Sequence, residues 1–399
     1  MTPHRHEAPA TFNRRRLLAF CLIVVLVFVD LALLGTTRLK PGVPVLPASS
    51  RAGGKRPAAA DARTSLLFST LDAEGLGSAL ILLEREAATD SVVLREGHQL
   101  AHALGRRAAV AHGGDASVIR ECRPSFGSGC YHGVVEASVR AGGGIDMSAL
   151  KKVCLAAGSD DRPGPRYECA HGLGHGTLGA LGYDVGATLR QCDALGAGLD
   201  DWCHIGVFME AIATALRTAM PMQHTHASAG INHFTIDPAD PYSPCDRVED
   251  LYASACWLFQ GFVILRSDGF DAAAALQTCD GAPAHRVERC YQSIGHQLTG
   301  LFQHDDRWIV DRCALGRADR AQHCAAGAAL ALTYMDWSGA RAAHFCANGP
   351  SGWKEACYRA AADLLSGLVS PARRIAFCAG VEAPFLGACR QAAGLEGKG

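Results

Sequence analysis

Histidines and one glutamate recur in pairs four residues apart in the first half of the chain. Residues with this spacing share one face of an α-helix, with Cβ atoms about 5–6 Å apart, so each pair can give two ligands to one ion. Imidazole and carboxylate groups suit iron, zinc or manganese. We therefore predict an iron or zinc site, at which metal-bound water or dioxygen would react. The predicted ligands are His98, His102, His132, Glu136, His171 and His175.

Cysteine spacing identifies the elements that must position these ligands. Of the 17 cysteines, Cys21 lies in a predicted membrane segment and the others fall into consecutive pairs. This regularity favours local disulfides, although sequence alone leaves other pairings open and buried free thiols are an alternative. The predicted pairs are Cys122–Cys130, Cys154–Cys169, Cys192–Cys203, Cys245–Cys256, Cys279–Cys290, Cys313–Cys324, Cys346–Cys357 and Cys378–Cys389.

The first cysteines of these pairs recur about every 34 residues, which is typical of arrays of two-helix repeats. In each repeat we expect a short helix that ends at the first cysteine and a longer helix that begins at the second. Glycine recurs a few residues after the second cysteine, as at Gly133, Gly206 and Gly295. Because glycine inside a helix costs about 1 kcal/mol relative to alanine, we expect neighbouring helices to approach closely there.

In period and cysteine placement, residues 120–399 resemble extracytoplasmic, disulfide-stapled helical-repeat proteins of the broad tetratricopeptide-like kind. The ordered Trp/Leu/Gly/Tyr signature of tetratricopeptide repeats is missing, so the resemblance implies an architecture and no function. That architecture is all-α, an α-solenoid in which antiparallel helix pairs form a right-handed stack. The cysteine-free stretch over residues 70–112 is expected to be helical and to cap the array.

Alignment on the second cysteine places His132 and His171 two residues, and Glu136 and His175 six residues, after that cysteine in consecutive long helices. The cysteine-free helix before them repeats the four-residue spacing with His98 and His102. Adjacent helices pack with their axes about 8–10 Å apart, so the six side chains can converge on two ions, with Glu136 bridging them. This design is similar in kind to HEAT-repeat di-iron hydroxylases, although the adjacent His-Glu dipeptides of those enzymes are missing. His204, Glu210 and His296 lie near the same register and are predicted as partners around the ligands.

Two interpretations without metal stay open. A histidine on an apolar helix face is usually a core residue, and divergence of repeats from one ancestral histidine can leave a polar seam. A groove lined by histidines can also bind an anion or a peptide. The function is therefore predicted as a metal-dependent oxygenase or hydrolase, or as a non-enzymatic scaffold that holds a peptide, protein or envelope component in its groove.

The N-terminal region predicts where the protein resides. Residues 1–16 end in three arginines and precede an apolar run over residues 17–35, which is nearly long enough to cross a bilayer. The positive-inside rule leaves residues 1–16 in the cytoplasm and exports the rest, through an uncleaved signal anchor or, as the alternative, a cleaved signal peptide. A flexible linker is expected over residues 36–63, before an extracytoplasmic domain over residues 64–399.

Composition excludes some classes of protein. The chain is 49% hydrophobic and 19% charged, which predicts a folded protein. Its 38 Lys and Arg are outnumbered by 39 Asp and Glu, and the basic residues are concentrated near the N-terminus, so the predicted domain is acidic. An acidic domain argues against a nucleic-acid partner. The expected partners are the membrane and a peptide or protein ligand.

Overall fold

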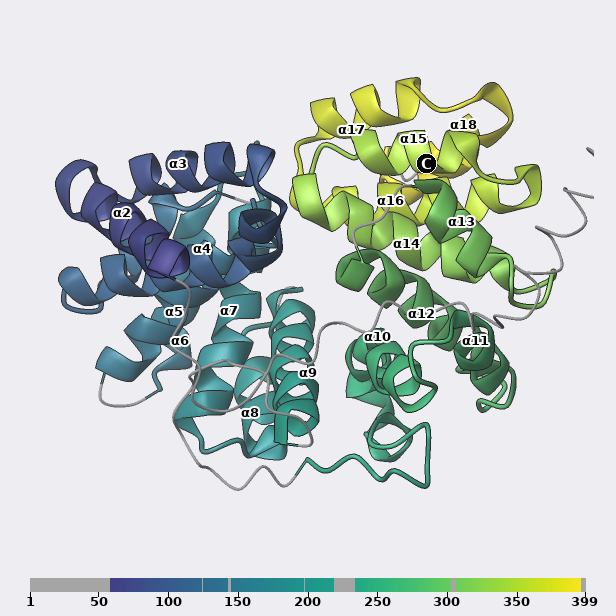
Figure 1. The fold of residues 1–399 in the computed structure, drawn as a ribbon, viewed down its shortest axis with the longest axis horizontal. Helices are drawn as coiled ribbons and strands as arrows, with labels where there is room; N and C mark the ends of the chain where they lie inside the picture. Colours follow the sequence, from purple (N-terminus) through teal and green to yellow (C-terminus); the bar gives the residue numbers. More distant parts are fainter. Residues whose placement is uncertain are drawn as a thin grey trace, which may run out of the picture. The chain divides into compact units, whose positions relative to one another are not determined.

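Helices make up the regular structure of the protein. The computed structural model describes residues 58–123, 125–142, 145–196, 198–218, 234–302 and 306–395. Within these ranges the regular elements are helices, which confirms the predicted all-α class (Figure 1). The longer helices that form the succession are α2 (Ala58–Glu74), α3 (Leu76–Thr89), α4 (Ser91–Ala111), α5 (Gly129–Ala141), α7 (Gly164–Ala180), α9 (Leu199–Thr218), α10 (Asp250–Ser267), α12 (Val287–Phe302), α14 (Ala321–Asp336) and α16 (Lys354–Leu368).

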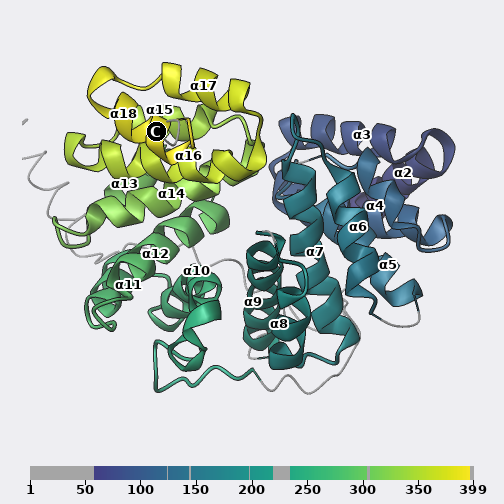
Figure 2. The ribbon, with the colours of Figure 1, turned by 180° about the vertical axis from the view of Figure 1, so that it is seen from behind.

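Shorter helices alternate with the long ones, as the repeat predicted. They are α6 (Met147–Ala157), α8 (Val185–Asp193), α11 (Ala272–Asp280), α13 (Asp306–Cys313), α15 (Ala340–Asn348) and α17 (Pro371–Ala379), and the final helix is α18 (Leu386–Ala392). Aspartate begins several of them. The carboxylate of Asp271 accepts hydrogen bonds from the backbone of Ala273 and Ala274, so it caps α11. Each long helix packs on the next long helix in the chain, and the helices form sequential pairs (Figure 2).

All eight predicted disulfides are formed between the expected cysteines. Their Cα–Cα distances run from 5.2 Å for Cys154–Cys169 to 5.8 Å for Cys378–Cys389, within the range that a disulfide can bridge. Each disulfide joins a short helix or 3-10 turn to the beginning of the following helix, which is a long helix in every repeat except the last, where it is α18. Disulfides in this number persist in oxidising compartments, which indicates an extracytoplasmic location.

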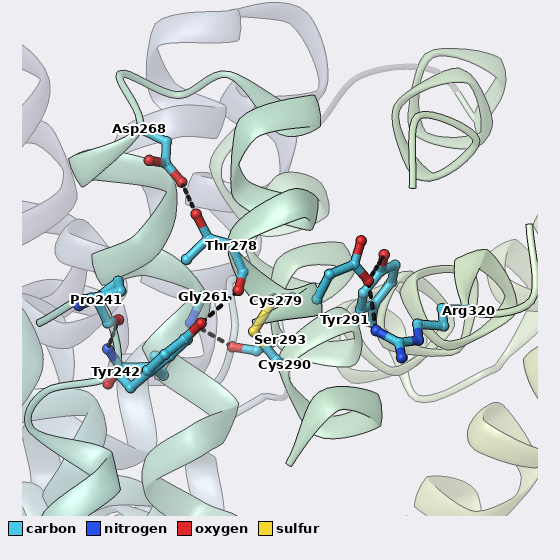
Figure 3. The surroundings of a disulfide bond; sticks show 12 residues. Pro241, Tyr242, Gly261, Asp268, Thr278, Cys279, Cys290, Tyr291, Ser293 and Arg320 are labelled. Carbon is cyan, nitrogen blue, oxygen red and sulfur yellow. Dashed lines mark hydrogen bonds and ion pairs between the residues drawn. A yellow bond between two sulfur atoms is a disulfide. The ribbon is translucent and has the colours of Figure 1, made fainter. Parts of the chain in front are cut away.

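Polar contacts accompany the disulfides, as Figure 3 shows around Cys279–Cys290. Tyr291, the residue after the second cysteine, donates its hydroxyl to Asp280 at 2.8 Å, and Arg320 donates to the same carboxylate at 2.7 Å. In another repeat, the hydroxyl of the equivalent Tyr131 donates to the Cys122 carbonyl at 3.1 Å. In these two repeats the tyrosine after the second cysteine therefore fastens the long helix to the segment before it.

Glycine lets the long helices touch at the predicted register. A Cβ added to Gly133 on α5 would collide with the His102 carbonyl of α4 and would lie 2.8 Å from the Arg106 nitrogen. The same addition at Gly206 would strike the backbone of α7, and at Gly327 it would strike the backbone of α12. The recurring glycine thus marks close backbone contact between consecutive long helices, as the sequence predicted.

Segments from the two halves of the sequence also meet. The Tyr334 hydroxyl of α14 donates to the Glu168 carboxylate of α7 at 2.8 Å. The ring of Tyr334 stacks on Trp202 of α9, with 6.3 Å between ring centroids. The C-terminal end of α14 therefore packs against α7 and α9, more than 130 residues away in the chain.

Several predictions at the N-terminus fall outside the described residues. These are the cytoplasmic segment 1–16, the membrane segment 17–35 and most of the linker. Helix α2 begins at Ala58, so the last residues of the predicted linker are helical, consistent with the high helix propensity of their alanines. Among the helices that are described, none combines the length and hydrophobicity needed to cross a membrane.

Candidate metal centre

The six predicted ligands come from three consecutive long helices. Helix α4 presents His98 and His102, helix α5 presents His132 and Glu136, and helix α7 presents the last two histidines. Glycine-mediated contacts bring these helices together: an added Cβ at Gly133 meets α4, and one at Gly172 would lie 3.3 Å from the Cα of His132. Close backbone approach is what allows short polar side chains from separate helices to meet.

His132, His171 and His175 form a compact group. One ring nitrogen from each lies within 4.8 Å of the others, and the ring centroids of His132 and His171 are 4.7 Å apart. The Nε2 atoms of His171 and His175 are 3.0 Å apart. Two nitrogens bound to one zinc or iron ion at about 2.0–2.1 Å lie roughly 2.8–3.4 Å apart for bond angles near 90–109°. These three residues, which we call the histidine triad, can hold a metal ion.

Burial shapes the chemistry of the triad. His132 is 1% exposed and His171 is 3% exposed, and both ring nitrogens of His132 and Nδ1 of His171 have no hydrogen-bond partner within the described parts of the chain. Burial, followed by the neighbouring histidines, holds the pKa of His132 and of His171 well below the usual value. Both imidazoles are therefore neutral at pH 7, which is the form that binds metals.

The other three predicted ligands lie beside the triad and have protein partners. The ring centroid of His98 is 5.4 Å from that of His132, and its Nδ1 is 2.9 Å from the Phe126 carbonyl. Nε2 of His102 lies 3.2 Å from one carboxylate oxygen of Glu136. The other oxygen of Glu136 pairs with Arg140 at 2.6 Å. The structure thus brings all six side chains together, with three of them in the compact triad.

The residues predicted around the ligands have different neighbours. Glu210 of α9 lies beside the triad: its Oε2 is 3.3 Å from Nδ1 of His175, and Thr214 donates to its other oxygen at 3.0 Å. His204 instead places Nε2 2.9 Å from the Asp193 carboxylate, which also accepts from Tyr252. Because His204 follows the second cysteine directly, it occupies the fastening position that Tyr131 and Tyr291 hold in other repeats.

His296 lies on α12 at the register of His175 but among other neighbours. Its ring packs edge-on to Phe259 at 6.3 Å, and its Nδ1 is 3.2 Å from the Gln297 amide. Burial, together with Arg289, lowers the pKa of His296 to about 4. At this register the neighbouring helices α10 and α14 carry leucine, phenylalanine and alanine, so no second group of histidines forms there among the described residues.

Glu168 and Tyr334 belong to the site but were absent from the sequence prediction. Glu168 is fully buried, and its Oε2 lies 3.9 Å from Nε2 of His132. Burial raises the pKa of Glu168 to about 7, against the opposing effect of the hydrogen bond from Tyr334. Sequence spacing could have identified Glu168, because residues 168, 171 and 175 share one helix face. Tyr334 comes from a distant repeat and leaves no such signal.

Comparisons with family models, curated proteins and solved structures found no match to this chain. The site is therefore described from the positions of its own residues alone. It consists of a buried histidine triad with unpartnered ring nitrogens, a pair formed by His102 and Glu136 beside it, and the carboxylates of Glu168 and Glu210 next to two of its histidines.

Proposed function

We propose that the protein is an extracytoplasmic metal-dependent enzyme, an oxygenase or a hydrolase, that holds zinc or iron at His132, His171 and His175. The observation behind this proposal is that three imidazoles lie close together, and that two of them, His132 and His171, are buried with three ring nitrogens that lack partners among the described residues. Leaving a buried polar atom without a partner costs about 1–3 kcal/mol. A metal ion would satisfy several such nitrogens at once.

The number of protein ligands supports a reactive metal over a structural one. Structural zinc sites are usually closed by four protein ligands, whereas catalytic sites keep a position for water or substrate. The compact group offers three ligands. Its least buried member is His175, whose side chain is 12% exposed, while His132 is nearly inaccessible. The site is therefore reached from the side of His175, and so narrow an approach suits a small reactant such as water or dioxygen.

The three predicted ligands outside the triad determine whether the site could hold a second ion. A further ion bound by His98, His102 and Glu136, with Glu136 as a bridge, would have to compete with Arg140 for the carboxylate. We therefore propose one ion at the triad as the primary site. The membrane segment over residues 17–35 completes the proposal by anchoring the enzyme to the outer face of the cytoplasmic membrane.

Elemental analysis of the purified full-length protein tests the metal site. We expect about one zinc or iron per chain, and its loss in His132→Ala and in His171→Ala. His344→Ala is the matched control, because His344 is 70% exposed and pairs with Asp306 on another face. Intact disulfides and a cooperative thermal transition would show that each variant is folded. A folded wild-type protein that takes up neither metal would overturn the proposal.

A second candidate function has its own observation. An open groove of about 640 Å³ lies over α12, α14 and α16, at the register that carries the triad in the first half. Its polar lining includes Gln292, His323, Glu355, Arg359 and Asp363. These mixed charges would suit a polar peptide, as in a scaffold protein. Pull-downs with the full-length protein and with Arg359→Glu test this function, and equal recovery of partners by both would count against it.

A further inference from the structure

Glu168 is a buried carboxylate whose presence the helical fold does not explain. It is 0% exposed, and its Oε1 has no hydrogen-bond partner within the described residues. It begins the face of α7 that continues through His171 and His175. A buried carboxylate is costly unless it is paired or serves a metal centre. The position of Glu168 therefore calls for a role within the site.

The neighbours of Glu168 define that role. On one side, Oε2 lies 3.9 Å from Nε2 of His132. On the other side, the same oxygen accepts the hydroxyl hydrogen of Tyr334 at 2.8 Å. Burial and the nearby carboxylate raise the pKa of Tyr334 well above its usual value, so this phenol stays protonated and acts as the donor. Tyr334, Glu168 and His132 thus form a chain that leads from α14 to the triad.

The other end of the triad has a closer carboxylate: Glu210 lies within hydrogen-bond distance of His175, whereas Glu168 lies 3.9 Å from His132, near enough for an ion pair and beyond a hydrogen bond. His175 directs Nε2 toward His171 and Nδ1 toward Glu210, 3.3 Å away. A histidine that ligates a metal through one nitrogen usually donates its other N–H to a carboxylate or carbonyl, and this contact fixes the ring orientation. Glu210 is in turn held by Thr214 and Tyr183, at 3.0 and 3.4 Å.

We propose that Glu168 is the carboxylate that orients His132 for metal binding, and that Tyr334 positions Glu168, so that a residue of the second half of the array sets the metal affinity of the first half. This inference rests on the proposed metal site. The packing of Tyr334 supports it: its ring stacks on Trp202, and a Cβ on Gly127 would contact both Tyr334 and His98. The tyrosine is therefore held in place by the loop and helices that surround the triad.

Metal affinity of Glu168→Gln and Tyr334→Phe tests the inference. Loss of a carboxylate that supports a ligating histidine typically weakens metal binding about 10- to 100-fold. We expect that loss in both variants of the full-length protein, measured by competition for Zn²⁺ with a chromophoric chelator. We also expect a changed visible spectrum for bound Co²⁺. Tyr358→Phe is the matched control, since Tyr358 is a buried tyrosine that donates to Glu382 in a distant repeat. It should bind Zn²⁺ like the wild type.

The outcomes separate this inference from the proposed function. If the wild type binds Zn²⁺ and both variants bind it equally tightly with an unchanged Co²⁺ spectrum, the supporting role is refuted while the metal site stands. If the wild type binds neither ion, the proposed function fails and the inference falls with it. A purely structural role would lower the melting temperature of a variant by the same amount with and without Zn²⁺, and would leave its affinity unchanged.

Discussion

The same substitution should have opposite effects at two glycines. Gly133 lies where α5 touches α4, and an added Cβ would collide with the His102 carbonyl and lie 2.8 Å from the Arg106 nitrogen. Gly300 lies on α12, and within the described parts of the chain no neighbouring segment comes within 4 Å of an added Cβ. We therefore expect Gly133→Ala to destabilise the protein and Gly300→Ala to stabilise it.

The magnitudes follow from packing and helix propensity. Replacing glycine by alanine inside a helix gains about 0.5–1 kcal/mol, and this gain is the whole effect at Gly300. At Gly133 the same gain is opposed by overpacking, which typically costs about 1–3 kcal/mol. The obstacle there is backbone, which cannot rotate aside, so the cost should lie at the upper end. The expected net loss at Gly133 is about 2 kcal/mol.

Denaturant unfolding of the disulfide-intact protein measures both effects. Gly327→Ala provides a third comparison, because its Cβ would strike the α12 backbone far from the triad. It should destabilise the protein like Gly133→Ala, but only Gly133→Ala should also reduce zinc binding, since it forces α5 away from α4. Equal stability of Gly133→Ala and Gly300→Ala would refute the close-contact explanation for the recurring glycine.

Further predictions concern pH and a disulfide. Because burial lowers the pKa of His132 and His171, the unfolded chain takes up more protons at these sites below pH 6.5, so they destabilise the metal-free protein as the pH falls. The pKa of Glu168, raised to about 7, has the opposite effect on stability between about pH 4.5 and 7. The effect of this one carboxylate is smaller than the combined effect of the two histidines. Melting temperatures should therefore fall on acidification, and a flat profile would contradict this. Replacing Cys313 and Cys324 by serine should cost about 3 kcal/mol of unfolding free energy, and a loss below about 1 kcal/mol in denaturant titrations would exclude the local-loop explanation.

Local periodicity made much of the fold predictable. The cysteine spacing identified the pairs because each disulfide closes a short loop, and the repeated glycine identified the helix contacts because only a missing Cβ permits them. The shared register after the second cysteine put His132 and His171 at equivalent places on consecutive long helices, and their ring centroids lie 4.7 Å apart. The disulfides, the glycine contacts and the register of the histidines each involve one repeat and its neighbour. The sequence of adjacent repeats is therefore enough to predict them.

Features that depend on distant repeats could not be predicted in this way. Tyr334 reaches Glu168 because α14 packs against α7, and no local spacing specifies that contact. The partner of His204 is set in a different way. Its position, one residue earlier than the register of the ligands, turns it toward Asp193, so a shift of one residue on a helix changed its partner.

Helix α14 shows that the fold itself does not require polar groups at the register of the triad. Ala326 is buried at the position equivalent to His132 and His171, and Leu330 stands at the position equivalent to His175. The triad instead leaves three buried nitrogens unpartnered among the described residues, at a cost of about 1–3 kcal/mol each. That cost is a large part of a stability of about 5–15 kcal/mol, and apolar residues would avoid it. A bound ion would offset the cost, so added zinc should raise the melting temperature of the wild type more than that of His171→Ala.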